Sequence, residues 1–136
     1  MQDQLRKLEQ FHETFQCYIN YEPAATLPED VQAVRVRLFE EELGEYRSAI
    51  GSGDIVEVAD ALTDMLYVLL GTFVAHGLQD LAGALFDEVH RSNMSKLDAA
   101  GQPVFRDDGK VLKSDLFEAP DLASILRNGR DEVIGE

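Results

Sequence analysis

Two clusters of carboxylates are the residues of this chain whose types and spacing could do chemistry. The clusters are separated by the glycine-rich break Gly51-Ser52-Gly53, and both fall on segments with helical periodicity. Their members are Glu40, Glu41, Glu42 and Glu45 before the break, and Glu57, Asp60 and Asp64 after it. On a helix, an acid is most unfavourable where it faces a core. The question is therefore which acids point inward, and what neutralises them there.

The acids of the first cluster continue an apolar stripe. Val31, Val34 and Leu38 follow one another at i+3 and i+4 spacing, and the same spacing leads through Glu41, Glu42 and Glu45 to Ala49. In the second cluster, residues 55–76 are apolar on almost every side, and Asp60 and Asp64 lie one turn apart on one face. Both patterns predict carboxylates directed toward buried surroundings.

A divalent cation is the neutralising partner that this pattern favours. Arg37 and Arg47 are the only basic residues among the eight acids of residues 37–64, so internal ion pairs cannot neutralise the set. A buried carboxylate without compensation is paired, protonated or bound to metal. Hard divalent cations take oxygen ligands, and Mg²⁺ is the one that also carries phosphate. The sequence therefore predicts a magnesium site that meets a phosphorylated ligand.

Composition and charge bound the class of protein. The chain has 136 residues, enough for one domain with a real core, and 45% of them are hydrophobic. A formal net charge of −14 argues against nucleic acid as the partner. The single Cys17 excludes an internal disulfide and a cysteine-rich zinc site. Asp60 and Asp64 interrupt the longest apolar stretch, and no signal-peptide pattern precedes it, so we expect a cytoplasmic protein without a membrane span.

The pattern of apolar residues predicts an all-α fold. Helices are expected over residues 3–20, about 28–50, 54–75 and 79–96, and their short connections favour an antiparallel four-helix bundle. Residues 104–112 read as a small hairpin or ordered loop around an Asp-Gly turn, and a short helix is expected from Pro120 to Leu126. The whole chain, 1–136, is predicted to be one domain, with a core over about 3–97 and with 98–127 lying over the site.

Three segments carry a resemblance to a known superfamily. The run Glu41-Glu42-Leu43-Gly44-Glu45 has the form Glu-Glu-x-x-Glu, and residues 58–68 look like a second acidic helix. Together they resemble the all-α nucleoside triphosphate pyrophosphohydrolases, which include MazG proteins, all-α dUTPases and phosphoribosyl-ATP pyrophosphohydrolase. Residues 86–96 and 108–113 are similar to the small bacterial MazG-like branch. The resemblance covers about residues 28–122.

The resemblance implies an activity and a set of site residues. Enzymes of this kind cleave a nucleotide between its α- and β-phosphates and release a monophosphate and pyrophosphate, with Mg²⁺, or Mn²⁺ as a substitute, bound by the carboxylates. By position, Glu42, Glu45 and Asp64 are the implied metal ligands, and Glu41 is a ligand or the catalytic base. The water is activated by metal and by a carboxylate.

One position departs from the pattern of the superfamily. The second acidic helix usually carries Glu-x-x-Asp, but aligning its tail on Met65-Leu66-Tyr67 makes Asp64 the aspartate and leaves Ala61 where the glutamate would stand. Either Asp60 supplies the missing oxygen, or Glu57-Val58-Ala59-Asp60 is the motif in a shifted register. Asp60 belongs to the site in both cases, whereas Glu57 belongs to it only in the second.

The basic residues beyond the acidic helices suggest the second half of a site. Asn93 and Lys96 resemble an Asn-x-x-Lys pair that meets the nucleotide in relatives, since an amide can read a base edge and an ammonium can hold a phosphate. Arg91 and Lys110 are further phosphate candidates.

The sequence thus predicts an Mg²⁺-dependent nucleotide pyrophosphohydrolase that cleans nucleotide pools. The branch resemblance favours a pyrimidine deoxynucleotide such as dUTP. Phosphoribosyl-ATP or another nucleotide is an alternative substrate, and a non-catalytic helical adaptor with a structural metal is an alternative function. Residues 55–76 are too apolar for a helix of a monomeric bundle that exposes one face to solvent, so a homodimer or a dimer of dimers is expected.

Overall fold

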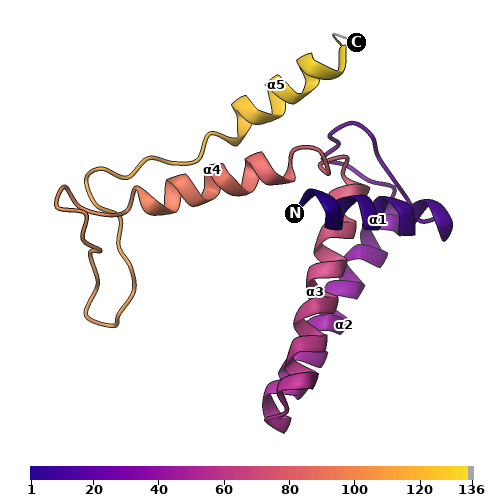
Figure 1. Cartoon of the computed structure of the whole chain (residues 1–136), viewed down its shortest axis with the longest axis horizontal. Coiled ribbons are helices and arrows are strands. Elements are labelled where there is room, and N and C mark those ends of the chain that lie inside the picture. Colours follow the sequence, from indigo (N-terminus) through magenta and orange to yellow (C-terminus); the bar gives the residue numbers. More distant parts are fainter. Residues whose placement is uncertain (135–136) are drawn as a thin grey trace. The chain divides into compact units, whose positions relative to one another are not determined.

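The computed structural model describes residues 1–134 and is built from helices (Figure 1). Within these residues no strand forms, which confirms the all-α class. The helices are α1 (Gln2–Thr14), α2 (Glu29–Ser52), α3 (Ile55–Ala75), α4 (Ala82–Met94) and α5 (Leu122–Ile134).

The chain divides into two compact units. The first is Met1–Asp80, which holds α1, α2 and α3, and the second begins at Leu81 and holds α4 and α5. Each unit is described by itself below. The single antiparallel four-helix bundle and the single domain with a core over 3–97 stay predictions.

An antiparallel hairpin of α2 and α3 is the centre of the first unit (Figure 1). Gly53 ends α2 in the left-handed region with φ of 73°, and the Asp54 carboxylate caps α3 by accepting from the Val56 amide at 2.8 Å. Near the other end, the Arg35 guanidinium donates to the Val68 carbonyl at 2.7 Å and to the Thr72 hydroxyl at 3.0 Å. These contacts at both ends fix the register of the two helices.

Helix α1 packs against the carboxyl half of α3. Leu5, Leu8 and His12 are its buried residues, at i+3 and i+4 spacing on one face. Gly71 permits the close approach, because a Cβ there would lie 2.9 Å from Arg35 Nη2 and 3.0 Å from His12 Nε2.

The prediction that the first helix reaches residue 20 was wrong. The helix ends at Thr14, because Gln16 takes a left-handed conformation with φ of 57°. The chain then crosses the end of α3, where the Asn20 amide donates to the Ala75 carbonyl at 2.9 Å and Gln79 donates to the Asn20 carbonyl at 2.9 Å. These side-chain hydrogen bonds, with one from the Asn20 backbone amide to the Val74 carbonyl at 3.2 Å, replace the last predicted turn.

The second unit confirms the ordered loop, one of the two predictions for residues 104–112, and departs from prediction at its last helix. Residues 104–112 form an ordered loop with one antiparallel bridge, between Phe105 and Val111, instead of two strands. Helix α5 begins at Leu122 and continues to Ile134, beyond the predicted end at Leu126. The predicted end of this helix at Leu126 was therefore wrong.

Helix α3 is more hydrophobic than the sequence analysis expected of any segment of this chain. By length and composition alone, α3 could cross a membrane, with a mean hydropathy of 1.5 in its most apolar window. The expectation that no stretch comes near this composition was therefore wrong. One such helix is weak evidence for a membrane, because the core helix of a soluble protein has the same composition.

Replacing Gly77 by alanine should strongly destabilise the first unit. Gly77 has φ of 70°, and a Cβ on it would lie 2.1 Å from the backbone oxygen of Glu22. Gly53 has nearly the same φ, 73°, with open space around it. We expect Gly77→Ala to lower the free energy of unfolding by more than about 3 kcal/mol, and Gly53→Ala by only about 1 kcal/mol. Chemical denaturation measures both, and equal losses would contradict the close packing at Gly77.

Candidate functional site

Three carboxylates from two helices meet between α2 and α3. Glu42 and Glu45 of α2 and Asp64 of α3 each offer one carboxylate oxygen, and these oxygens all lie within 4.8 Å of one another. Glu42 and Glu45 share a face because they are one turn apart, and the antiparallel register brings Asp64 opposite them. The structure thus brings together the three residues that the sequence ranked first as metal ligands.

Glu42 is the least compensated acid of this group. Its Oε2 atom is buried and has no hydrogen-bond partner among the described residues. Burial raises the pKa of the Glu42 carboxyl, and the negative charges of Glu45, Asp64, Glu41 and Asp60 raise it further. This carboxylate needs a proton or a cation.

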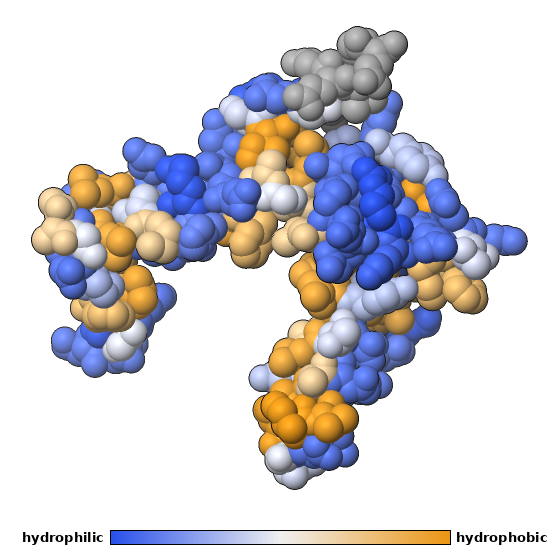
Figure 2. Space-filling view, in the orientation of Figure 1, coloured by the Kyte–Doolittle hydropathy of each residue, from blue (hydrophilic) through white to orange (hydrophobic). Residues whose placement is uncertain are grey.

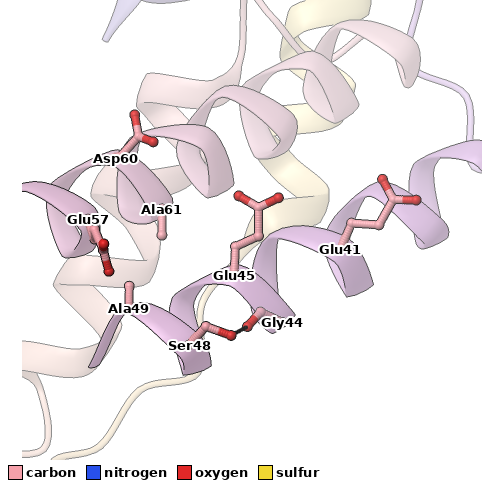
Figure 3. A pocket seen from close by; sticks show the side chains of 8 residues that line it. All are labelled: Glu41, Gly44, Glu45, Ser48, Ala49, Glu57, Asp60 and Ala61. Atoms are coloured by element: carbon pink, nitrogen blue, oxygen red, sulfur yellow. Dashed lines mark hydrogen bonds between the residues drawn. The ribbon is translucent and has the colours of Figure 1, made fainter. Parts of the chain in front are cut away.

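A pocket of about 460 Å³ opens between the two helices beside these acids (Figure 3). Figure 3 shows the acids that line it, Glu41 and Glu45 on α2 and Glu57 and Asp60 on α3. Its remaining lining is small or polar, with Gly44, Ser48, Ala49 and Ala61. The wall is mostly carboxylate and small side chains, so the pocket suits a cation and a polar ligand.

The register question from the sequence stays open in part. Asp60 lines the pocket, in agreement with both readings of the second acidic motif. Glu57 lines it as well, which the shifted reading requires. Asp64 lies instead with Glu42 and Glu45. The acids of α3 therefore extend over about two turns of helix along the same side.

Cations do little to offset this charge. Among the described residues, Arg37 forms the one ion pair with the cluster, at 3.6 Å from Glu41, and both side chains are more than half exposed. Exposed pairs of this kind contribute little. The oxygen-only donor set and the orphaned Glu42 oxygen fit a hard divalent cation.

The predicted nucleotide-binding residues lie in the second unit. The Lys96 ammonium donates to the Asn93 side-chain oxygen at 2.7 Å, so these two residues form a pair at the end of α4. Arg91 is held by Glu88 at 2.8 Å and by Glu118 at 2.7 Å. The Arg91 guanidinium lowers the pKa of Glu88 to about 2. The Lys110 amide donates to Asp108 at 3.1 Å. Their role toward a nucleotide stays a prediction.

Sequence reasoning missed a second cavity in the first unit, of about 270 Å³. His12 and Arg35 line it together with Phe11, Tyr18 and other residues. His12 is buried with Nδ1 donating to the Tyr18 carbonyl at 2.9 Å, and burial lowers its pKa. Arg35 was identifiable, because it occupies the i+4 position after Val31 on the inward stripe of α2. His12 lies on the buried face of α1, and no pattern in the sequence indicates that it lines the same cavity as Arg35.

Comparison with known families identifies the family of this chain. The sequence profile of phosphoribosyl-ATP pyrophosphohydrolase matches residues 8–93, well over half of the chain. The chain belongs to this family. The resemblance to the all-α nucleoside triphosphate pyrophosphohydrolase superfamily is thereby confirmed, and the match includes both acidic segments. A search of curated proteins gives no match to the chain.

Family membership supports an enzyme that hydrolyses an acid anhydride of a nucleotide. The range matched by the family profile, residues 8–93, includes Glu42, Glu45 and Asp64 and all residues that line the pocket beside them. Residues after 93, including Lys96 and Lys110, lie outside the matched range. The matched range includes α2 and α3 in full and, among the predicted nucleotide-binding residues, Arg91 and Asn93.

The raised pKa of Glu42 predicts a pH dependence of stability in the metal-free protein. A carboxyl whose pKa is higher in the folded state holds its proton more tightly there. Its contribution to stability is present below the ordinary value of 4.5 and is lost as pH rises through the raised pKa. Glu42→Gln cannot titrate, so this loss should be absent from the variant.

We therefore expect the stability of the native protein, relative to Glu42→Gln, to fall as pH rises above about 4.5. Urea denaturation of both proteins with a chelator present, over a series of pH values, measures the difference. Parallel stability curves would show that Glu42 titrates as an ordinary exposed acid.

Proposed function

We propose that this protein is an Mg²⁺-dependent nucleotide pyrophosphohydrolase of the cytoplasm that removes non-productive or excess nucleotides. It cleaves a (deoxy)nucleoside triphosphate, with dUTP favoured, between the α- and β-phosphates to a monophosphate and pyrophosphate. The observation that carries the proposal is the buried, unpartnered Glu42 oxygen beside Glu45 and Asp64, within the range matched by the family.

The carboxylates have two roles in this proposal, to bind the metal and to act as the base. Glu42, Glu45 and Asp64 hold the cation, and Asp60 adds oxygen to the same side of α3. A bound Mg²⁺, or Mn²⁺ in its place, supplies charge to the phosphate oxygens and lowers the pKa of a water. Glu41 is an exposed ligand or the base, and as base its carboxylate takes the proton of the attacking water.

The substrate is held by the residues that carry the opposite charge. Lys96, just after α4, is paired with Asn93 of α4, and together they present an ammonium and an amide, the groups suited to a phosphate and a base edge. Arg91 and Lys110 are secondary phosphate candidates, because Arg91 already binds Glu88 and Glu118. A pyrimidine deoxynucleotide is favoured by the likeness of residues 86–96 to the MazG-like branch.

Two other functions remain for the test to separate. The name of the matched family favours phosphoribosyl-ATP as an alternative substrate. A helical adaptor that holds a structural metal through Glu42, Glu45 and Asp64 would have the same cluster and no activity. A panel of substrates distinguishes dUTP from phosphoribosyl-ATP as the substrate. Release of pyrophosphate distinguishes an enzyme from a non-catalytic adaptor.

Pyrophosphate release tests the proposal directly. We expect the native protein with Mg²⁺ to release pyrophosphate from the panel of common nucleotides, fastest from dUTP. Asp64→Asn should lower kcat by on the order of 100-fold or more, since a charge that stabilises the transition state is lost. Asp107→Asn, at an exposed loop acid, is the matched control and should keep full activity. Release that Asp64→Asn leaves intact would refute the site, and no release from any substrate, phosphoribosyl-ATP included, would favour the adaptor.

Two further substitutions test the register of the second acidic motif. Asp60→Asn should reduce kcat by at least about 10-fold, because Asp60 lines the pocket in both readings. Glu57→Gln should have a similar effect only in the shifted register and none in the other. Steady-state kinetics with a saturating Mg²⁺ series measures both variants, and full activity of Asp60→Asn would remove Asp60 from the site.

A further inference from the structure

The cavity of about 270 Å³ that His12 and Arg35 line is separate from the carboxylate site. Its lining comes from α1 and the turn after it, from the first half of α2 and from the end of α3. None of these residues lines the pocket beside the acids. Arg35 precedes Glu42 by seven residues on α2, which is about 10 Å along the helix axis. The first unit therefore contains two distinct hollows, and we call this one the Arg35 cavity.

The walls of the Arg35 cavity are mostly apolar. They include Phe11, Tyr18, Val31, Val34, Leu38 and Ala75. Figure 2 shows hydrophilic side chains over the outward side of α1, so the apolar lining contrasts with the outer surface of that helix. Phe11, Tyr18 and Val34 are each between 37% and 40% exposed. The cavity is therefore open to solvent at these three residues.

The Arg35 guanidinium brings an uncompensated positive charge to this apolar lining. Its Nε and Nη2 atoms donate to the Thr72 hydroxyl and to the Val68 carbonyl, and both acceptors are uncharged. In the part of the chain that the structure describes, Arg35 forms no ion pair, although Asp30 lines the same cavity. Burial lowers the pKa of Arg35, but a guanidinium keeps its proton in proteins. A half-buried charge of this kind is stabilised by a counter-ion.

His12 lies at the same corner of the cavity and adds no second charge. A Cβ on Gly71 would lie 2.9 Å from Arg35 Nη2 and 3.0 Å from His12 Nε2, so both nitrogen atoms lie close to Gly71. Burial is the main reason that the pKa of His12 is lowered, and the charge of Arg35 lowers it further. The imidazole is therefore neutral at neutral pH. This corner of the cavity carries one positive charge.

A carboxylate is the anion that suits this corner. The N–H groups of Arg35 left for a ligand are those of Nη1 and the second one of Nη2, because Nε and the first are bonded to α3. Two neighbouring N–H groups of a guanidinium match the two oxygens of a carboxylate. A doubly charged phosphate would leave one negative charge without a partner among apolar side chains.

The size of the cavity limits the rest of the ligand. Pockets for drug-sized ligands have volumes of about 300 to 1,000 Å³, so a cavity of about 270 Å³ fits a smaller molecule. An aromatic ring or a branched aliphatic chain is the kind of group that packs against Phe11, Tyr18 and Val34. An uncharged ring alone would leave the charge of Arg35 without a counter-ion.

We propose that the Arg35 cavity binds a small organic monocarboxylate, with the carboxylate on the Arg35 guanidinium and an apolar body against Phe11, Tyr18 and Val34. This inference goes beyond the proposed function and does not depend on it. A nucleoside triphosphate is a poorer occupant, because one guanidinium cannot neutralise three phosphates.

Benzoate is the probe for this site, since it joins one carboxylate to one apolar ring. Benzoate is titrated into the ¹⁵N-labelled native protein without nucleotide and with a chelator present, and NMR follows the amide resonances. We expect saturable binding with a Kd of about 1 mM or below. Benzyl alcohol, which has the same ring and no charge, should bind at least about 10-fold more weakly. Absence of saturable binding, equal affinity for benzyl alcohol, or tighter binding of inorganic phosphate than of benzoate would each overturn the proposal.

Substitutions at the cavity test where the probe binds. Arg35→Met keeps a long side chain without the charge and should weaken benzoate binding by at least about 10-fold. Arg37→Met, on the same helix and outside the cavity, is the matched control and should bind benzoate as the native protein does. Circular dichroism confirms that both variants are helical. Native affinity in the helical Arg35→Met protein would overturn the assignment.

A second pair of variants leaves Arg35 intact, because Arg35→Met also removes two hydrogen bonds to α3. Val34→Phe places a larger side chain at the opening of the cavity and should weaken benzoate binding several-fold. Val36→Phe makes the same change at an exposed residue outside the cavity and should leave the binding unchanged. Equal benzoate affinity of the two variants would show that the probe binds elsewhere.

Discussion

The constraint on which the structure depends is the burial of one oxygen of the half-buried Glu42 carboxylate among other acids. Its Oε2 atom has no partner among the described residues, and Glu45 and Asp64 lie beside it. Without a cation this arrangement is unfavourable, so the surrounding fold must hold it in place. The tight turn at Gly53 and Asp54 and the Arg35 hydrogen bonds to α3 do so, because they fix the register that sets Asp64 opposite α2.

The register of α2 and α3 therefore decides which side chains share one side of the hairpin. The same antiparallel register that gathers the acids on one side places Leu43, Leu62 and Leu66 on the other. A change of one residue in register would rotate apolar side chains toward the carboxylate pocket and acids away from it. This is why the packing of α1 against Gly71, although it lies away from the acids, contributes to their geometry through α3.

Helical periodicity predicted most of what lies along a single element. It identified α2 and α3 within about two residues and indicated inward-facing acids, because these acids interrupt an apolar stripe. The choice of Glu42, Glu45 and Asp64 among them came from the resemblance to the superfamily. It missed the end of α1, which depends on the left-handed conformation of Gln16 and on hydrogen bonds to α3. It missed the cavity that His12 and Arg35 line together for a related reason, since these two residues are on different helices. The division into two units likewise depends on contacts between elements, which no local pattern encodes.

The most direct test of the account is metal binding to the chelator-treated protein. Mn²⁺ titrated into the native protein and followed by electron paramagnetic resonance should show saturable binding. Glu45→Gln should weaken that binding by at least about 10-fold, because one of three converging carboxylates is lost. Glu13→Gln, on α1, should bind as the native protein does. Equal Mn²⁺ affinity of the native protein and Glu45→Gln would contradict the assignment of the α2–α3 carboxylates as the metal site.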